Sequence, residues 1–92
     1  MSSVDFYFEG QNLTIQCNRY DKMKQIFQNF YSKAGVSPNS VTFLYNGRDI
    51  TNEGSTFYQL ANIDDKNRNK MNILVTNIPN NSSSQFFFER GD

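Results

Sequence analysis

The sequence predicts a small α+β domain in which one helix packs across a single sheet. Segments with alternating apolar and polar residues stand at both ends of residues 4–75, as is typical of strands. One segment with a helical period lies between them. Ninety-two residues suffice for one hydrophobic core. A single amphipathic helix covers only one face of a small sheet, so the two layers must meet through their apolar sides.

The first two strands are expected near the N-terminus. In residues 4–8 (V-D-F-Y-F) the apolar side chains share one face, and Asp5 and Tyr7 point to the other. Residues 9–12 (E-G-Q-N) are typical turn formers, and residues 13–17 (L-T-I-Q-C) alternate again. The two segments are therefore expected to pair as a β-hairpin.

The main helix is expected over residues 21–34, where the period changes from two to 3.6. Apolar side chains recur at i, i+3, i+4, i+7 and i+11 along one side: Met23, Ile26, Phe27, Phe30 and Ala34. Asn18 or Asp21 is the expected N-cap. Gly35 stands where a left-handed residue commonly ends a helix.

A second hairpin is expected after the helix. Residues 41–45 (V-T-F-L-Y) read as a third strand. Asn46-Gly47 is a strong two-residue turn signal, and residues 48–50 can return as a short fourth strand.

The last strand is expected at residues 71–75 (M-N-I-L-V). Before it, residues 51–63 read as a loop that Phe57 and Leu60 anchor in the core. Residues 64–70 (D-D-K-N-R-N-K) are wholly polar, so an exposed loop is expected there.

The composition argues against several classes of function. Nine basic and nine acidic residues give a formal charge of zero, which provides no general attraction to nucleic acid or to an anionic membrane. No apolar run approaches the roughly 18 residues that a membrane span needs. The chain has no His and one Cys, which removes the commonest general base and every Ser-His or Cys-His pair. We therefore expect no enzyme activity, no cofactor, no metal, no membrane insertion and no small-molecule substrate.

The single cysteine, Cys17, has no partner for an internal disulfide, which fits a reducing intracellular compartment. It shares a face with Leu13 and Ile15 and is expected in the core. The first residues contain neither a basic signal-peptide region nor an Arg-rich presequence. The expected location is cytoplasmic by default, and mitochondrial import without a cleaved presequence stays open.

Two segments, Lys33–Ile50 (KAGVSPNSVTFLYNGRDI) and Ser55–Leu60 (STFYQL), resemble the ubiquitin-like β-grasp family. The resemblance covers about residues 4–75, and F-L-Y-N-G at residues 43–47 is closest in wording to SUMO-type members. It implies a mixed sheet of four to five strands with one main helix packed across it. Function does not follow from this fold, which serves many unrelated processes.

The resemblance also implies which surface binds proteins. Leu44 and Leu74 stand at positions of the family's apolar recognition patch, and Asn72 matches a polar neighbour of that patch. Alternation also places both leucines on the outward face. The turn at residues 10–12 lacks the apolar residue that ubiquitin presents there. We expect Leu44, Leu74 and Asn72 to contribute to a protein-binding face.

The C-terminal segment carries the other candidate contact. Residues 80–84 (N-N-S-S-S) read as a polar tether. The cluster that follows is Phe86, Phe87 and Phe88. Burial of a Phe side chain contributes about 1.5–3 kcal/mol, and six other Phe residues already supply the core. We therefore expect a ubiquitin-like domain at residues 1–78 and, at residues 79–92, a tether with a Phe-rich anchor for a partner.

Three hypotheses for function follow. The leading one is a non-catalytic protein–protein interaction module, acting as a docking or structural subunit of a multiprotein complex, with other protein subunits as partners. The second is the ubiquitin-like domain of a ubiquitin-pathway protein that mimics ubiquitin towards a receptor. The third is a conjugated modifier. It is disfavoured because conjugated members end in Gly-Gly and the sequence contains no Gly pair.

Overall fold

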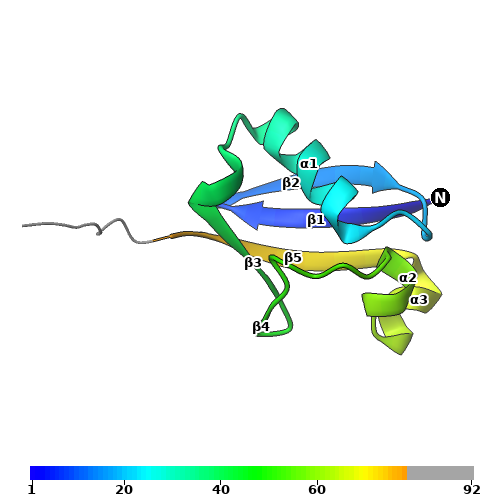
Figure 1. Ribbon diagram of the computed structural model, residues 1–92. Helices are drawn as coiled ribbons and strands as arrows, with labels where there is room; N and C mark the ends of the chain where they lie inside the picture. Colours follow the sequence, from blue (N-terminus) through cyan, green and yellow to red (C-terminus); the bar gives the residue numbers. More distant parts are fainter. Residues whose placement is uncertain (79–92) are drawn as a thin grey trace, which may run out of the picture.

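The computed structural model describes residues 1–78 of the chain. The elements follow in the order β1 (Ser2–Phe8), β2 (Gln11–Cys17), α1 (Met23–Ala34), the 3-10 helix η1 (Pro38–Ser40), β3 (Val41–Tyr45), β4 (Arg48–Asp49), α2 (Phe57–Leu60), α3 (Ile63–Arg68) and β5 (Lys70–Asn77). The strands form one sheet in the order β2-β1-β5-β3-β4, and α1 packs across it (Figure 1). β1 and β5 are parallel and the other neighbours are antiparallel, so the sheet is mixed as predicted.

Both predicted hairpins form around two-residue turns. Glu9 and Gly10 have φ angles of 51° and 77°, and Asn46 and Gly47 have φ angles of 51° and 81°. Positive φ at both central positions matches the right-handed twist of the paired strands, and Gly adopts it without a Cβ clash. The first turn is shorter than the predicted residues 9–12, because Gln11 and its neighbour already pair with β1.

The helix α1 buries four of the five residues of the predicted stripe, and Ala34 is partly buried. Its N-terminal cap differs from the prediction. Its N-cap residue is Lys22, which makes no capping side-chain hydrogen bond. The Asp21 carboxylate instead accepts a hydrogen bond from the Asn18 N–H at 2.9 Å. The Met23 N–H donates to the Ser55 carbonyl at 2.9 Å. A backbone carbonyl of a neighbouring loop thus accepts a hydrogen bond from a free N–H group at the start of the helix, in place of a capping side chain. At the other end Gly35 takes the predicted left-handed conformation.

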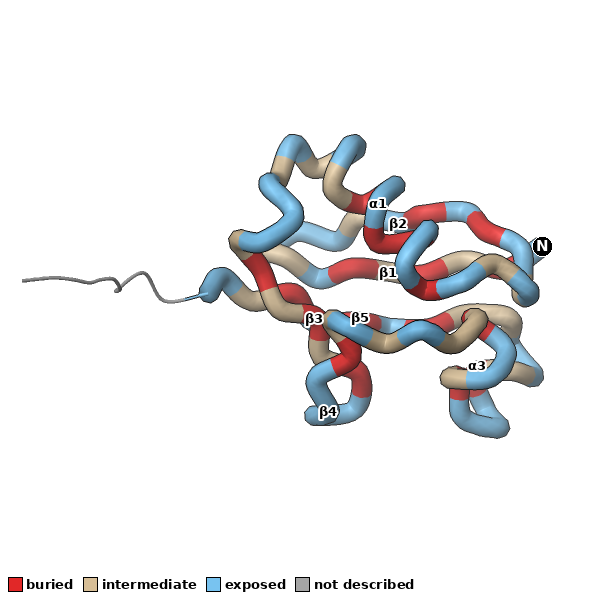
Figure 2. The backbone as a smooth tube through the Cα atoms, viewed as in Figure 1, coloured by how far each residue is buried: buried red, intermediate tan, exposed pale blue. Residues whose placement is uncertain are grey.

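An aromatic cluster fills the layer between α1 and the sheet. Phe27 of α1 stacks on Phe43 of β3 with ring centroids 4.0 Å apart, and Phe6 of β1 lies 4.5 Å from Phe30. All four side chains are buried, and buried residues alternate along the strands (Figure 2). The buried Cys17 lies in the same core, as predicted. Among residues 1–78, this packing leaves the opposite face of the sheet without a helix across it.

The prediction of an exposed loop at residues 64–70 is wrong. The segment contains most of α3 and the first residue of β5. The Asn62 side chain caps the helix by accepting from the Asp65 N–H at 2.8 Å, and Asn69 ends the helix in the left-handed conformation. Asp65 is buried, which a wholly polar segment did not suggest.

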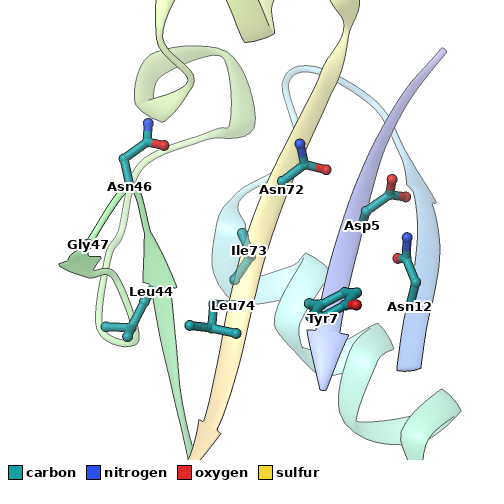
Figure 3. A pocket seen from close by; sticks show the side chains of 9 residues that line it. All are labelled: Asp5, Tyr7, Asn12, Leu44, Asn46, Gly47, Asn72, Ile73 and Leu74. Atoms are coloured by element: carbon teal, nitrogen blue, oxygen red, sulfur yellow. The ribbon is translucent and has the colours of Figure 1, made fainter. Parts of the chain in front are cut away.

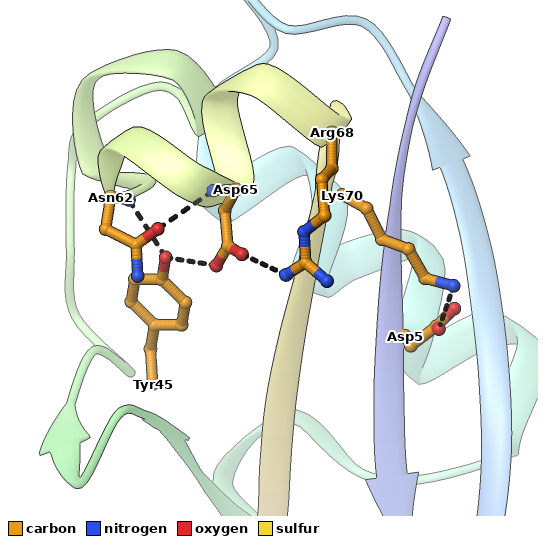
Figure 4. Close-up of polar contacts among 6 residues, drawn as sticks. All are labelled: Asp5, Tyr45, Asn62, Asp65, Arg68 and Lys70. Atoms are coloured by element: carbon orange, nitrogen blue, oxygen red, sulfur yellow. Dashed lines mark hydrogen bonds and ion pairs between the residues drawn. The ribbon is translucent and has the colours of Figure 1, made fainter.

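Tyr45 explains why a carboxylate is buried in α3. Its hydroxyl donates to Asp65 at 2.5 Å and accepts from the Asn62 N–H at 2.9 Å (Figure 4). Arg68 pairs with the same carboxylate from the exposed side. Burial, together with the hydrogen bond to Asp65, raises the pKa of Tyr45 to about 12. The hydroxyl therefore stays protonated and ties α3 to the end of β3.

Candidate protein-binding face of the sheet

One row of outward side chains crosses all five strands on the face opposite α1. Tyr7 of β1 pairs with Asn12 of β2 on one side and with Leu74 of β5 on the other. Leu74 pairs with Leu44 of β3, and Leu44 pairs with Asp49 of β4. The strand register therefore aligns residues that are up to 67 positions apart in the sequence.

The centre of this row is an apolar strip, which we define as Tyr7, Leu74 and Leu44. Tyr7 is 55% exposed and Leu74 is 47% exposed, while Leu44 is half-buried between its neighbours. Adjacent strands lie about 4.8 Å apart, so the strip is roughly 10 Å wide across three strands. Exposed apolar side chains that touch one another mark contact surfaces more often than scattered ones do.

The strip forms the floor of a shallow groove of about 470 Å³. Figure 3 shows the three apolar side chains in line across β1, β5 and β3. Three amides also line the groove: Asn12, Asn46 and Asn72. Amides donate and accept hydrogen bonds without carrying charge. The groove therefore suits a partner that has apolar side chains flanked by backbone or other neutral polar groups.

Asp5 also lines the groove, but its charge is compensated. Its carboxylate pairs with Lys70 at 2.9 Å (Figure 4). It also accepts from the Thr14 hydroxyl at 2.7 Å. Burial alone would raise the pKa of Asp5, but the hydrogen bonds from Thr14 and Lys70 and the lysine charge lower it. Asp5 is therefore ionised and paired at neutral pH, and the pair contributes no net charge to the groove.

The charged side chain of the row lies at one end, and it forms no ion pair within residues 1–78. Asp49 of β4 accepts a hydrogen bond from the Thr51 N–H at 2.9 Å. The hydrogen bonds of the Thr51 side chain and backbone lower the pKa of Asp49. The row thus runs from an amide at Asn12, across the apolar strip, to a carboxylate at Asp49, which gives the face a direction.

The structure brings together three of the six predicted site residues. Leu44 and Leu74 are direct neighbours, and Asn72 lines the same groove. The other three, the Phe residues at positions 86–88, lie outside the described residues, so their role stays a prediction. Tyr7 is a candidate that the sequence reasoning did not select. Its outward direction was readable from alternation, but its contact with Leu74 depends on the parallel β1–β5 pairing.

Residues 1–78 contain no group of three or more His, Cys, Asp or Glu side chains placed to hold a metal ion. Among the helices that the structure describes, none has the length and apolar character to cross a membrane.

Comparison with known proteins gives matches only among structures. No family model matches the sequence, and no curated protein matches it. The UBL domain of yeast Ddi1 matches with a TM-score of 0.68 at 14% identity, over 88% of this chain and 93% of that one. The ubiquitin-like domain of the Arabidopsis thaliana protein At2g32350 matches with a TM-score of 0.69 at 11% identity, over 90% and 83%.

A third match is a chain in the crystal structure of ATBAG1 in complex with HSP70. Its TM-score is 0.68 at 9% identity, and the match covers 86% of this chain but 41% of that one, so this chain spans less than half of its length. Identities this low establish the fold alone. The chain has the ubiquitin-like β-grasp fold, a mixed five-stranded sheet with α1 packed across one face.

Proposed function

We propose that this protein is a non-catalytic interaction module that docks on another protein through the open face of its sheet. The observation that carries the proposal is the apolar strip, because three apolar side chains stand together on the face that α1 does not cover. In this proposal the module is a docking or structural subunit of a larger assembly.

The strip has the makeup of an interface centre. Tyr is enriched at protein interfaces because its ring contributes a large area and its hydroxyl still finds a hydrogen bond. The amides around the strip supply a polar rim that excludes water from the apolar contact. A partner that buries the exposed half of Leu74 and Tyr7 gains about 1 kcal/mol from each side chain. The residues that contribute affinity are therefore few and can be tested individually.

The Phe cluster at residues 86–88 is the second part of the proposal. A tether at residues 80–84 allows that cluster to reach a pocket on the protein that the sheet face already contacts. The second contact then occurs at high effective concentration, which strengthens binding without changing the first contact.

A second candidate function is mimicry of ubiquitin towards a receptor. Leu44 and Leu74 favour this function, because they stand at positions of the recognition patch of the ubiquitin-like family that the sequence resembles. A chain from a complex with HSP70 among the similar folds supports a protein as the class of partner. Competition distinguishes the two candidates, because a receptor of ubiquitin releases this protein when free ubiquitin is added. A dedicated docking partner does not release it.

The test is retention of the native partner by variants of the whole chain. Leu44→Ser/Leu74→Ser removes two thirds of the strip, whereas Ile63→Ser removes an equally aliphatic side chain that is 75% exposed on α3. All three positions are partly or largely exposed, so the domain is expected to stay folded, as a thermal melt will show. We expect the double variant to lose the partner and Ile63→Ser to keep it. Equal retention by both variants would contradict the proposal.

A further inference from the structure

A second exposed surface lies on other elements of the fold. Four side chains form it, and we define them as the cation–tyrosine patch: Arg19, Tyr20, Tyr58 and Lys66. They come from the β2–α1 connection, from α2 and from α3, and none of them lines the groove on the sheet. Figure 1 shows α2 and α3 at the end of the sheet where β1 begins.

The patch is built around the ring of Tyr58. Tyr20 and Tyr58 are 70% and 40% exposed, and their ring centroids lie 6.3 Å apart. The Arg19 guanidinium carbon lies 5.3 Å from the Tyr58 centroid, and the Lys66 ammonium nitrogen lies 4.8 Å from it. Both distances fall within the range of a cation–π contact. Two exposed aromatic rings and two cations thus share one small surface.

The backbone and a neutral side chain hold the patch in place. The Tyr58 N–H donates to the Arg19 carbonyl at 2.9 Å, which joins α2 to the β2–α1 connection. The Arg19 guanidinium donates to the Asn69 side-chain oxygen at 2.6 Å. Asn69 orients the guanidinium without neutralising it. Groups that are ordered before binding lose less entropy when a ligand arrives.

Within residues 1–78, neither cation forms an ion pair with a carboxylate. Each lies about 5 Å from the same ring centroid, so they are no more than about 10 Å apart. The ion pairs among residues 1–78 involve other cations, namely Arg48, Arg68 and Lys70. The carboxylates close to the two cations in sequence have other partners: Asp21 accepts from the Asn18 N–H, and Asp65 is held by Tyr45 and Arg68. The patch therefore offers positive charge beside exposed aromatic surface.

We propose that the cation–tyrosine patch binds an acidic peptide segment of a partner protein. A carboxylate of the peptide pairs with Arg19 and Lys66, and an apolar side chain next to it packs on Tyr20 and Tyr58. Two cations match one or two carboxylates, whereas binding to nucleic acid rests on the neutralisation of several phosphates. The inference does not depend on the sheet face, because the two surfaces share no residue.

The test is an NMR titration of the whole 92-residue chain with a synthetic peptide of alternating Glu and Leu. Chemical shifts report binding even at millimolar affinity, so a missing response is informative. We expect shifts confined to the patch residues and their neighbours, no such shifts with a peptide in which Gln replaces Glu, and weaker binding as salt is raised. Shifts spread over the sheet groove instead, or none at millimolar peptide, would overturn the proposal.

Two charge-matched variants sharpen the test. Arg19→Gln/Lys66→Gln should weaken binding of the acidic peptide roughly fivefold to tenfold, as expected for two exposed ion pairs. Lys24→Gln/Lys33→Gln removes the same charge from α1, where both lysines are exposed, and should leave the affinity within about twofold. Equal losses in both variants would mean a general charge effect and would reject the site. Tighter binding of a ten-nucleotide oligouridine to the same residues would also reject an acidic peptide as the ligand.

Discussion

Removal of the Tyr45 hydroxyl should destabilise the domain far more than its small size suggests. In Tyr45→Phe the buried Asp65 carboxylate loses a donor at 2.5 Å, and the Asn62 N–H loses its acceptor. A hydrogen bond to a charged group contributes about 1.5–3 kcal/mol, and a buried polar group left without a partner costs about 1–3 kcal/mol. Arg68 still pairs with Asp65, which moderates the loss. We expect a decrease of about 2–4 kcal/mol in the free energy of unfolding, measured by urea denaturation.

Tyr31→Phe is the matched control for this measurement. Tyr31 also packs against the core, but its hydroxyl makes no hydrogen bond within residues 1–78. Its removal should change the free energy of unfolding by less than about 0.5 kcal/mol. If Tyr45→Phe proved as mild as Tyr31→Phe, the hydroxyl would not be what holds α3, and the explanation of the buried carboxylate would fail.

The same hydroxyl predicts how stability changes at alkaline pH. Burial and the bond to Asp65 raise the pKa of Tyr45 to about 12 in the folded state, compared with about 10 in the unfolded chain. The folded state therefore binds this proton more tightly, and the contribution of Tyr45 is complete below about pH 10. It is lost as pH rises from about 10 to 12. Between about pH 10 and pH 12, the free energy of unfolding should fall less steeply in Tyr45→Phe than in the unaltered protein. Parallel plots of this free energy against pH would contradict the raised pKa of Tyr45.

Three further outcomes are expected. Phe43→Ala, which removes a fully buried ring stacked on Phe27, should lower the free energy of unfolding by about 3–5 kcal/mol in the same urea assay. Leu74→Ala should cost less than about 1 kcal/mol, because half of the side chain is already in water. Deletion of residues 79–92 should leave the melting temperature nearly unchanged and weaken retention in the native complex. If the deletion instead lowered the free energy of unfolding by several kcal/mol, residues 79–92 would pack on the domain itself.

The sequence predicted the elements that local patterns specify. The stripe from Met23 to Phe30 is buried as its helical spacing indicates, and Asn46-Gly47 forms the turn that its residue types favour. The fold class followed from these elements and their order. Local patterns succeed here because the side-chain period of a helix or strand depends only on residues close in sequence.

The missed features depend on contacts between distant residues. α3 is stabilised by Tyr45, which lies 20 positions before Asp65, so its polar sequence gave no sign of a buried carboxylate. The N-terminus of α1 is satisfied by the Ser55 carbonyl rather than by a nearby side chain. Tyr7 joins the apolar strip only because β1 and β5 pair in parallel. The residues of the apolar strip could therefore not all be identified before the strand register was known.

In the proposed function, the open sheet face contacts a partner protein. Carbene footprinting of the native complex, compared with the free 92-residue chain, tests it most directly, because the label reports which side chains lose access to solvent. We predict that labelling at Tyr7, Leu44 and Leu74 falls severalfold in the complex, while labelling at the exposed Ile63 is unchanged. If all three residues of the strip label equally in the free and bound protein while another surface is protected, the sheet face is not the docking site.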